Sequence, residues 1–127
     1  MTVALMNERT RQPVALSVEI AATRKSRRRG LLGRDRLDDA SAMLLAPCTA
    51  VHTAGMRFAI DVVFLDRQGY AVKVVRGLRP WRIALAAGGR AVIEMAAGSL
   101  SWGQVLIGDR LYLEPASSAM ACDDTRS

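Results

Sequence analysis

Residues 58–76 read FAIDVVFLDRQGYAVKVVR, and this stretch decides the fold class. Residues 58–65 are rich in β-branched and aromatic side chains, which is typical of a buried strand. Residues 66–69 have the composition of a turn that ends in glycine, and residues 70–76 are again rich in valine. The stretch therefore predicts an antiparallel β-hairpin in which residues 58–65 pair with residues 70–76.

Shorter β segments lie on both sides of this hairpin. Apolar residues alternate with small or polar ones over residues 14–20, which predicts a strand with one buried face. Further strands are predicted at residues 42–45, 91–96 and 111–114. Two short helices are predicted, one from the N-cap Thr23 to about Leu32 and one from Ser99 to about Val105. We therefore predict a mainly β fold, a small closed barrel or sandwich of about six to seven strands with one or two short helices.

The length of 127 residues fits one domain. We expect an N-terminal extension over residues 1–13, a single globular domain over residues 14–115 and a flexible C-terminal tail over residues 116–127. Residues 1–13 lack the apolar run of a secretory signal, and no apolar run reaches the roughly 20 residues of a membrane-spanning helix. We therefore expect a cytoplasmic protein with no membrane partner. Cys48 and Cys122 lie far apart, which favours free thiols over a disulfide.

Basic residues outnumber acidic ones by 18 to 12, so the formal net charge is +6. The segment Arg24–Arg36 contains seven basic residues and one acidic residue, Asp35. Arginine binds phosphate and carboxylate groups with two parallel hydrogen bonds, so this cluster predicts an anionic ligand or a nucleic-acid backbone. The aromatic residues are few and do not alternate with basic ones as a base-stacking surface requires, so nucleic acid is the less favoured of the two.

Cys48, His52 and Asp61 form the strongest catalytic hypothesis. An imidazole beside a thiol would activate it as a nucleophile, and Asp61 would orient the imidazole. Cys48 and His52, with Glu94 or Asp61 as a third ligand, would alternatively bind a metal ion, although a structural zinc site usually has four ligands. The favoured interpretation is structural: a small buried cysteine, a hydrogen-bonded histidine and an ion pair. We accordingly expect no metal and no other cofactor, and the sequence does not decide whether the protein is an enzyme.

Two carboxylates, Asp61 and Glu94, lie inside predicted strands, where an unpaired charge is costly. Arg27, Arg29 and Arg57 are the expected partners.

Two tryptophans, Trp81 and Trp102, each follow a turn pattern, and we expect both to cover the core. An exposed stacking role is the alternative for Trp81, which lies between Arg79 and Arg82.

Several ordered blocks resemble the domain of unknown function 192 family. Thr23, Arg27, Arg29, Gly30 and Leu31 are similar to its opening Thr-x-x-x-Arg-x-Arg-Gly-Leu pattern. Further blocks are similar at Met43–Leu45, Ile60–Asp66, Val92–Met95 with Gly98, and Gly108–Asp109. The similarity covers about residues 14–114. It implies a compact, mainly β domain and no established activity.

This chain departs from the family pattern at one block. The family's Trp-Met-Lys-Asn-Thr is replaced by His52-Thr-Ala-Gly-Met-Arg57, and Ala42 stands where a glycine is usual, which indicates a variant subgroup. We predict a non-enzymatic binding or accessory module with a polar, arginine-containing patch for a small anionic ligand or a protein partner. The expected patch consists of Thr23, Arg27, Arg29, His52, Arg57, Asp61 and Glu94. The alternatives are a thiol-dependent hydrolase or metal site at Cys48, His52 and Asp61, and nucleic-acid binding through Arg24–Arg36.

Overall fold

The computed structural model describes residues 2–38, 40–101 and 103–116. This part of the chain forms ten strands and one short helix. Their bounds are β1 Val3–Asn7, β2 Gln12–Ala15, β3 Ser17–Ala21, α1 Arg24–Arg29, β4 Ser41–Leu45, β5 Ala50–His52, β6 Ile60–Leu65, β7 Ala71–Leu78, β8 Ile83–Leu85, β9 Ala91–Ala96 and β10 Leu111–Pro115. The mainly β class is confirmed. The strands are more numerous than expected because β1, β5 and β8 were not predicted and because the strand expected over residues 14–20 is two strands, β2 and β3.

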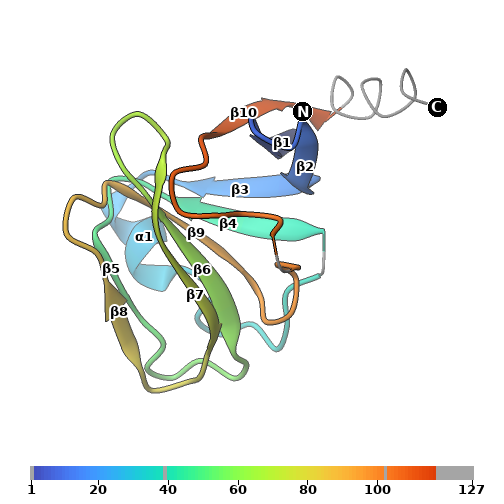
Figure 1. Cartoon of the computed structure of the whole chain (residues 1–127). Coiled ribbons are helices and arrows are strands. Elements are labelled where there is room, and N and C mark those ends of the chain that lie inside the picture. The colour runs from blue at the N-terminus through green and yellow to red at the C-terminus, as the bar shows by residue number, and fades with distance from the viewer. Residues whose placement is uncertain (1, 39, 102, 117–127) are drawn as a thin grey trace.

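The strands form three sheets (Figure 1). The largest has the order β3-β4-β9-β6-β7, the second β10-β1-β2, and β5 and β8 form a two-stranded ribbon. β3 and β4 are parallel, and the chain between them contains α1, because a parallel connection needs a crossover. Within the described residues the sheets pack as a sandwich and do not form the closed barrel that was the other expectation.

The predicted hairpin is confirmed as β6 and β7, which pair antiparallel. In its turn, Asp66 Oδ1 accepts hydrogen bonds from the backbone N–H groups of Gln68 and Tyr70, both at 2.9 Å. Gly69 has a φ of 92°, and a Cβ atom added there would lie 2.7 Å from the carbonyl oxygen of Leu111. The turn therefore needs glycine for its backbone conformation and for its close approach to β10.

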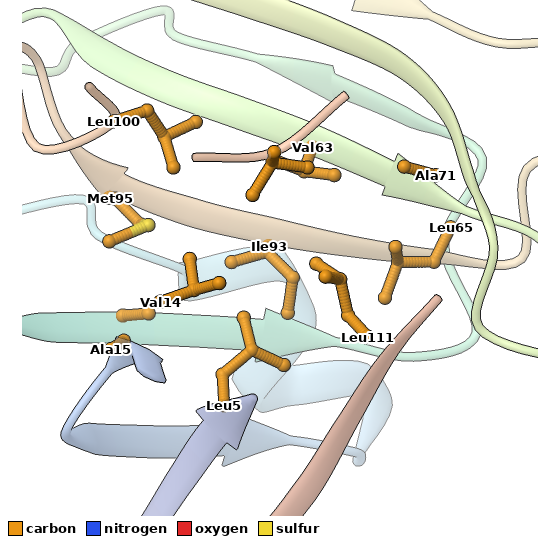
Figure 2. Close-up of a cluster of buried hydrophobic side chains, with 12 residues drawn as sticks. Leu5, Val14, Ala15, Val63, Leu65, Ala71, Ile93, Met95, Leu100 and Leu111 are labelled. Carbon is orange, nitrogen blue, oxygen red and sulfur yellow. The ribbon is translucent and has the colours of Figure 1, made fainter. Parts of the chain in front are cut away.

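Every residue of β6 is buried, because both faces of the five-stranded sheet are covered. Core A lies between this sheet and β10-β1-β2, and it contains Leu5, Val14, Val63, Ile93 and Leu111 (Figure 2). Core B lies on the opposite face, under α1 and the β5–β8 ribbon, and it contains Leu31, Val51, Val62, Phe64 and Ala84. Residues of odd and even number in β6 therefore serve different cores.

Several expected boundaries need correction. Residues 3–7 were expected in an extension but form β1, which lies between β10 and β2 and is largely buried. The strand expected over residues 14–20 is broken at Leu16, because β2 and β3 belong to different sheets. The helix expected after Ser99 is absent from residues 99–101 and 103–105. Residues 117–127 of the expected tail, Cys122 among them, and Trp102 lie outside the described residues. No helix in the described part of the chain is long and apolar enough to span a membrane.

Candidate functional site: a pocket between α1, β5 and β9

The helix α1 forms one wall of the candidate site. Thr23 is its N-cap, as predicted: Thr23 Oγ1 accepts from the Ser26 backbone N–H at 3.0 Å, and Ser26 Oγ accepts from the Thr23 backbone N–H at 3.1 Å. This capping box satisfies two donors of the first turn. The helix ends at Arg29 rather than Leu32, because Gly30 leaves the helix with a φ of 49°. Thr23 therefore stabilises α1 and does not line the pocket.

The pocket has a volume of about 90 Å³. A single water needs about 10–15 Å³ on this measure, so the pocket holds a group of several non-hydrogen atoms. Its polar lining residues are Arg27, Cys48, His52 and Glu94. Its other lining residues are Gly30, Leu31, Leu32, Leu45, Ala50, Val51, Ala54 and Met56. Leu32 and His52 are exposed, so the pocket reaches the protein surface.

Glu94 is the buried acid of this pocket. It is 4% exposed, and burial raises the pKa of its carboxyl group to about 7. It lies on the face of β9 that points to core B, and a Cβ atom added to Gly30 would lie 3.7 Å from its Oε1. No described side chain forms an ion pair with it, and the side chain of Arg29, an expected partner, lies outside the described part of the chain. Near neutral pH a fraction of Glu94 is therefore protonated and able to donate a hydrogen bond.

Arg27 is the cation of the pocket. Its Nη1 donates to the backbone carbonyls of Ala22, at 2.5 Å, and of Ala46, at 3.3 Å. These bonds attach the guanidinium group to the wall through one terminal nitrogen. The expected pairing of Arg27 with a strand carboxylate is wrong, because backbone carbonyls of the neighbouring loops take its place.

Cys48 is half-buried, and its thiol donates to the backbone carbonyl of Ala50 at 3.1 Å rather than to the ring of His52. Burial raises the pKa of the Cys48 thiol, and the nearby charge of Glu94 acts in the same direction. A thiol that stays protonated is a poor nucleophile. The arrangement therefore does not favour the hydrolase hypothesis.

Asp61 lies on the opposite face of the sheet from the pocket. Its Oδ1 accepts from the backbone N–H of Gly77 at 2.8 Å, and its Oδ2 accepts from those of Gly98 and Leu100 at 3.0 and 3.1 Å. Asp61 is 1% exposed, so these three bonds satisfy a buried carboxylate. The predicted contact with His52 and the predicted arginine partner are both wrong, because backbone amides bind this side chain.

The segment Arg24–Arg36 does not form one basic patch. Arg34 forms two hydrogen bonds with Glu19, and Arg36 lies 3.8 Å from Asp38. Arg57 pairs with Asp35 on the surface, so its predicted pairing with Asp61 or Glu94 is wrong. These local ion pairs leave less free charge than the sequence indicates and do not favour a nucleic-acid interface.

A metal site is not favoured either. The described residues contain no group of three or more histidine, cysteine, aspartate or glutamate side chains that could hold a metal ion. Cys48, His52 and Glu94 line the same pocket without forming such a group.

Sequence reasoning missed Thr53 and misplaced Trp81. Thr53 is fully buried, and its hydroxyl donates to the Arg79 carbonyl at 2.6 Å and accepts from the Arg82 backbone N–H at 2.8 Å. Its own backbone C=O accepts from the Trp81 N–H at 3.0 Å. Trp81 was expected to cover the core, but its side chain is 70% exposed because Thr53 fixes the loop around it. A threonine in a loop gives no local pattern that reveals such long-range contacts.

The sheets and the pocket define a small, mainly β domain with a mixed five-stranded sheet at its centre. The family model described as "DUF192: Uncharacterized ACR, COG1430" matches residues 5–113, and the chain belongs to this family. The resemblance read from the sequence is confirmed. A UPF0127 protein of Thermococcus sibiricus is 33% identical over 102 residues, and the match covers 76% of this chain and 66% of that protein. The chain therefore spans just under two thirds of that relative's length.

Two crystal structures share the fold. A protein of unknown function from Novosphingobium aromaticivorans has a TM-score of 0.75 and 20% identity, with 88% of this chain and 84% of that chain covered. A protein from Sinorhizobium meliloti, provisionally described as a transcription regulator, has a TM-score of 0.74 and 24% identity, with 87% and 90% covered. At these identities the two structures support the fold alone.

Proposed function

We propose that this protein is a non-enzymatic binding module whose pocket takes a small anionic group, such as a carboxylate or phosphate. One observation carries the proposal: Arg27, Cys48, His52 and Glu94 come from separate segments of the chain and line one pocket. Arg27 supplies the positive charge, and the formal net charge of +6 favours the approach of anions. Protonated Glu94 donates a second hydrogen bond to the bound group.

The raised pKa of Glu94 gives the proposed site a distinctive pH dependence. Below about pH 7 the carboxyl group is protonated and binds an anion, whereas above it the carboxylate repels one. The other ionisable groups at the pocket are Arg27, Cys48 and His52. A His52→Gln variant separates the contribution of the imidazole from that of Glu94.

Titration calorimetry with acetate, inorganic phosphate and sulfate tests the proposal. The experiment is run below the pKa of about 7 of Glu94. We expect saturable binding of at least one anion, a loss of about tenfold or more in Arg27→Met, and no loss in the matched control Arg57→Met. Arg57 is an exposed arginine paired with Asp35 outside the pocket.

A second variant keeps the test independent of α1 stability. Ala54→Leu fills the pocket without removing a charge, and we expect it to weaken binding as Arg27→Met does. Equal affinities in the wild type and in both pocket variants would contradict the proposal, as would no binding of any of the three anions by the wild type.

A further inference from the structure

The outer face of the β5–β8 ribbon carries large apolar side chains. Ile83 and Leu85 are 72% and 59% exposed, while Ala84 between them is buried in core B. The register pairs Ile83 with His52 and Leu85 with Ala50, so these four side chains share the outer face. Trp81 is 70% exposed and lies two residues before β8. In Figure 1 this ribbon lies away from the β10-β1-β2 sheet.

The exposure of Trp81 is fixed by the fold. Its φ of 64° lies in the left-handed region, which a residue with a bulky side chain adopts only when its surroundings impose it. Thr53 imposes it, because five hydrogen bonds join Thr53 to Arg79, Trp81 and Arg82. The protein therefore holds an indole in solvent at a cost in backbone energy. We infer that the exposed Trp81 side chain contacts another molecule.

The segment of the chain that contains Trp81, Ile83 and Leu85 carries charge of one sign. From Arg67 to Ile93 the sequence has six basic residues and no acidic residue. Arg79 and Arg82 flank Trp81, and neither forms an ion pair with a described side chain. The Lys73 Nζ donates to the Leu85 carbonyl at 2.8 Å, which places a further cation beside β8. Exposed apolar side chains and free cations together suit a partner that is both apolar and anionic.

We propose that Trp81, Ile83 and Leu85 form a membrane-contact face that binds bilayers containing anionic lipid. Tryptophan suits the boundary between lipid and water, aliphatic side chains enter the acyl region, and arginines bind the lipid phosphates. These side chains protrude, and a fluid bilayer surrounds protruding groups without needing a matching cavity. This inference revises the sequence-based expectation of no membrane partner.

Other occupants fit this face less well. A second copy of the chain would bring two sets of cations together, and like charges repel. Single-stranded nucleic acid binds by stacking bases on several aromatic rings, whereas Ile83 and Leu85 offer none. Trp81, Ile83 and Leu85 do not line the pocket, although His52 and Ala50 beside Ile83 and Leu85 do.

Vesicle co-sedimentation tests this inference with vesicles of phosphatidylcholine alone and of phosphatidylcholine mixed with phosphatidylglycerol. We expect the full chain to bind the mixed vesicles, to bind the neutral ones much more weakly, and to dissociate as salt is raised. The double variant Ile83→Ser/Leu85→Ser should lower the partition coefficient about tenfold or more.

The chain offers a matched control. Ile107 is 71% exposed, almost the same as Ile83, but it lies in the loop before β10, and Ile107→Ser should bind as the wild type does. Trp81→Gly provides a second variant that stays folded, because glycine adopts the φ of this position without strain. It should bind vesicles less well while its melting temperature does not fall.

Three results would overturn the inference. The first is no binding to the mixed vesicles at low salt, and the second is the same loss for Ile107→Ser as for Ile83→Ser/Leu85→Ser. The third is that Trp81, Ile83 and Leu85 are needed for self-association or oligonucleotide binding and not for vesicle binding. Anion binding in the pocket should be unchanged in Trp81→Gly. A failure of the membrane face is therefore distinguishable from a failure of the proposed pocket function.

Discussion

Asp61 and Glu94 lie on neighbouring strands of one sheet and face opposite cores. Three backbone N–H groups bind the Asp61 carboxylate, which makes it a structural link between β6, β7 and the loop after β9. Glu94 has no such set of donors among the described residues, and burial raises the pKa of its carboxyl group to about 7. Two buried acids thus have different roles, because one is solvated by the backbone and the other faces a pocket.

The variant Glu94→Gln should change how stability depends on pH. The folded-state pKa of about 7 lies above the ordinary value of 4.5, so the folded protein binds this proton more tightly than the unfolded chain. The associated stability is fully present below pH 4.5 and is lost as pH rises toward 7. The free energy of unfolding of the wild type should fall by on the order of 3 kcal/mol relative to the variant over this range.

Urea unfolding at a series of pH values measures this difference. The two proteins should have similar stability near pH 4, and Glu94→Gln should be the more stable one above pH 7. Parallel curves over the whole range would show that Glu94 titrates normally.

Among the secondary-structure elements, those whose pairing partners are close in the sequence could be predicted. The hairpin of β6 and β7 was predictable because residues 58–76 contain both strands and their turn. β5 and β8 were missed because each has three residues and pairs only with the other, about 30 positions away. Residues 50–52 of β5 line the pocket, and β5 forms only by pairing with β8. The sequence did predict one patch containing Arg27, His52 and Glu94, and these three line the pocket together with Cys48. It did not show that Thr23, Arg57 and Asp61 would lie outside that pocket.

The same limit explains the wrong ion pairs. The sequence predicted that the buried carboxylate of Asp61 needs a hydrogen-bonding partner, and the structure confirms this. The partners are backbone N–H groups of Gly77, Gly98 and Leu100, which no side-chain pattern can reveal. The exposure of Trp81 likewise depends on Thr53, whose contacts arise only once β5 and β8 are paired.

The turn of the hairpin gives a prediction at this scale. Gly69→Ala introduces both a left-handed alanine and a contact of 2.7 Å with the Leu111 carbonyl oxygen, so it should lower the free energy of unfolding by about 2–4 kcal/mol. Gly88→Ala is the matched control, because Gly88 also has a positive φ, of 80°, but has no atom within 4 Å of the added Cβ.

Guanidinium unfolding of both variants isolates the contact with β10. Gly88→Ala should cost about 1–2 kcal/mol, the conformational part alone. Equal costs for the two variants would show that the approach of the turn to β10 does not constrain Gly69.

At the scale of the whole molecule, the first and last described segments are joined by one buried polar cluster. Asp109 accepts from Arg9 Nε at 2.8 Å, from Asn7 Nδ2 at 2.9 Å and from the Leu106 backbone N–H at 2.8 Å. Asn7 is fully buried and also donates to the Gln104 carbonyl at 2.9 Å. β1 is thereby fastened to the loop before β10, which explains why residues 3–7 belong to the fold.

Because of this cluster, we expect the free energy of unfolding to fall at acidic pH. Hydrogen bonds from Arg9 above all, and from Asn7 and the Leu106 backbone N–H, lower the pKa of Asp109 from 3.8 to about 2. The stability that they provide is therefore present above pH 3.8 and is lost as pH falls through about 2. Arg9 is 45% exposed and solvent weakens its charge, so the expected contribution is smaller than the full pKa shift of Asp109 implies.

Arg9→Met should remove most of this contribution at neutral pH and little near pH 2. Thermal unfolding at both pH values measures it, with the exposed ion-pair variant Arg36→Met as control. A loss at neutral pH no greater than that of Arg36→Met would show that the cluster does not stabilise the fold.

The proposed function requires the pocket between α1, β5 and β9 to bind a small anion. A ¹H–¹⁵N NMR titration of the labelled protein with acetate and inorganic phosphate, below and above pH 7, tests it most directly. We predict saturable shifts in the amides of residues 27–32 and 48–56 and near Glu94, with weaker binding at the higher pH. Shifts that fail to saturate, or that gather at Arg34, Arg36 and Asp38 instead, would contradict the proposal.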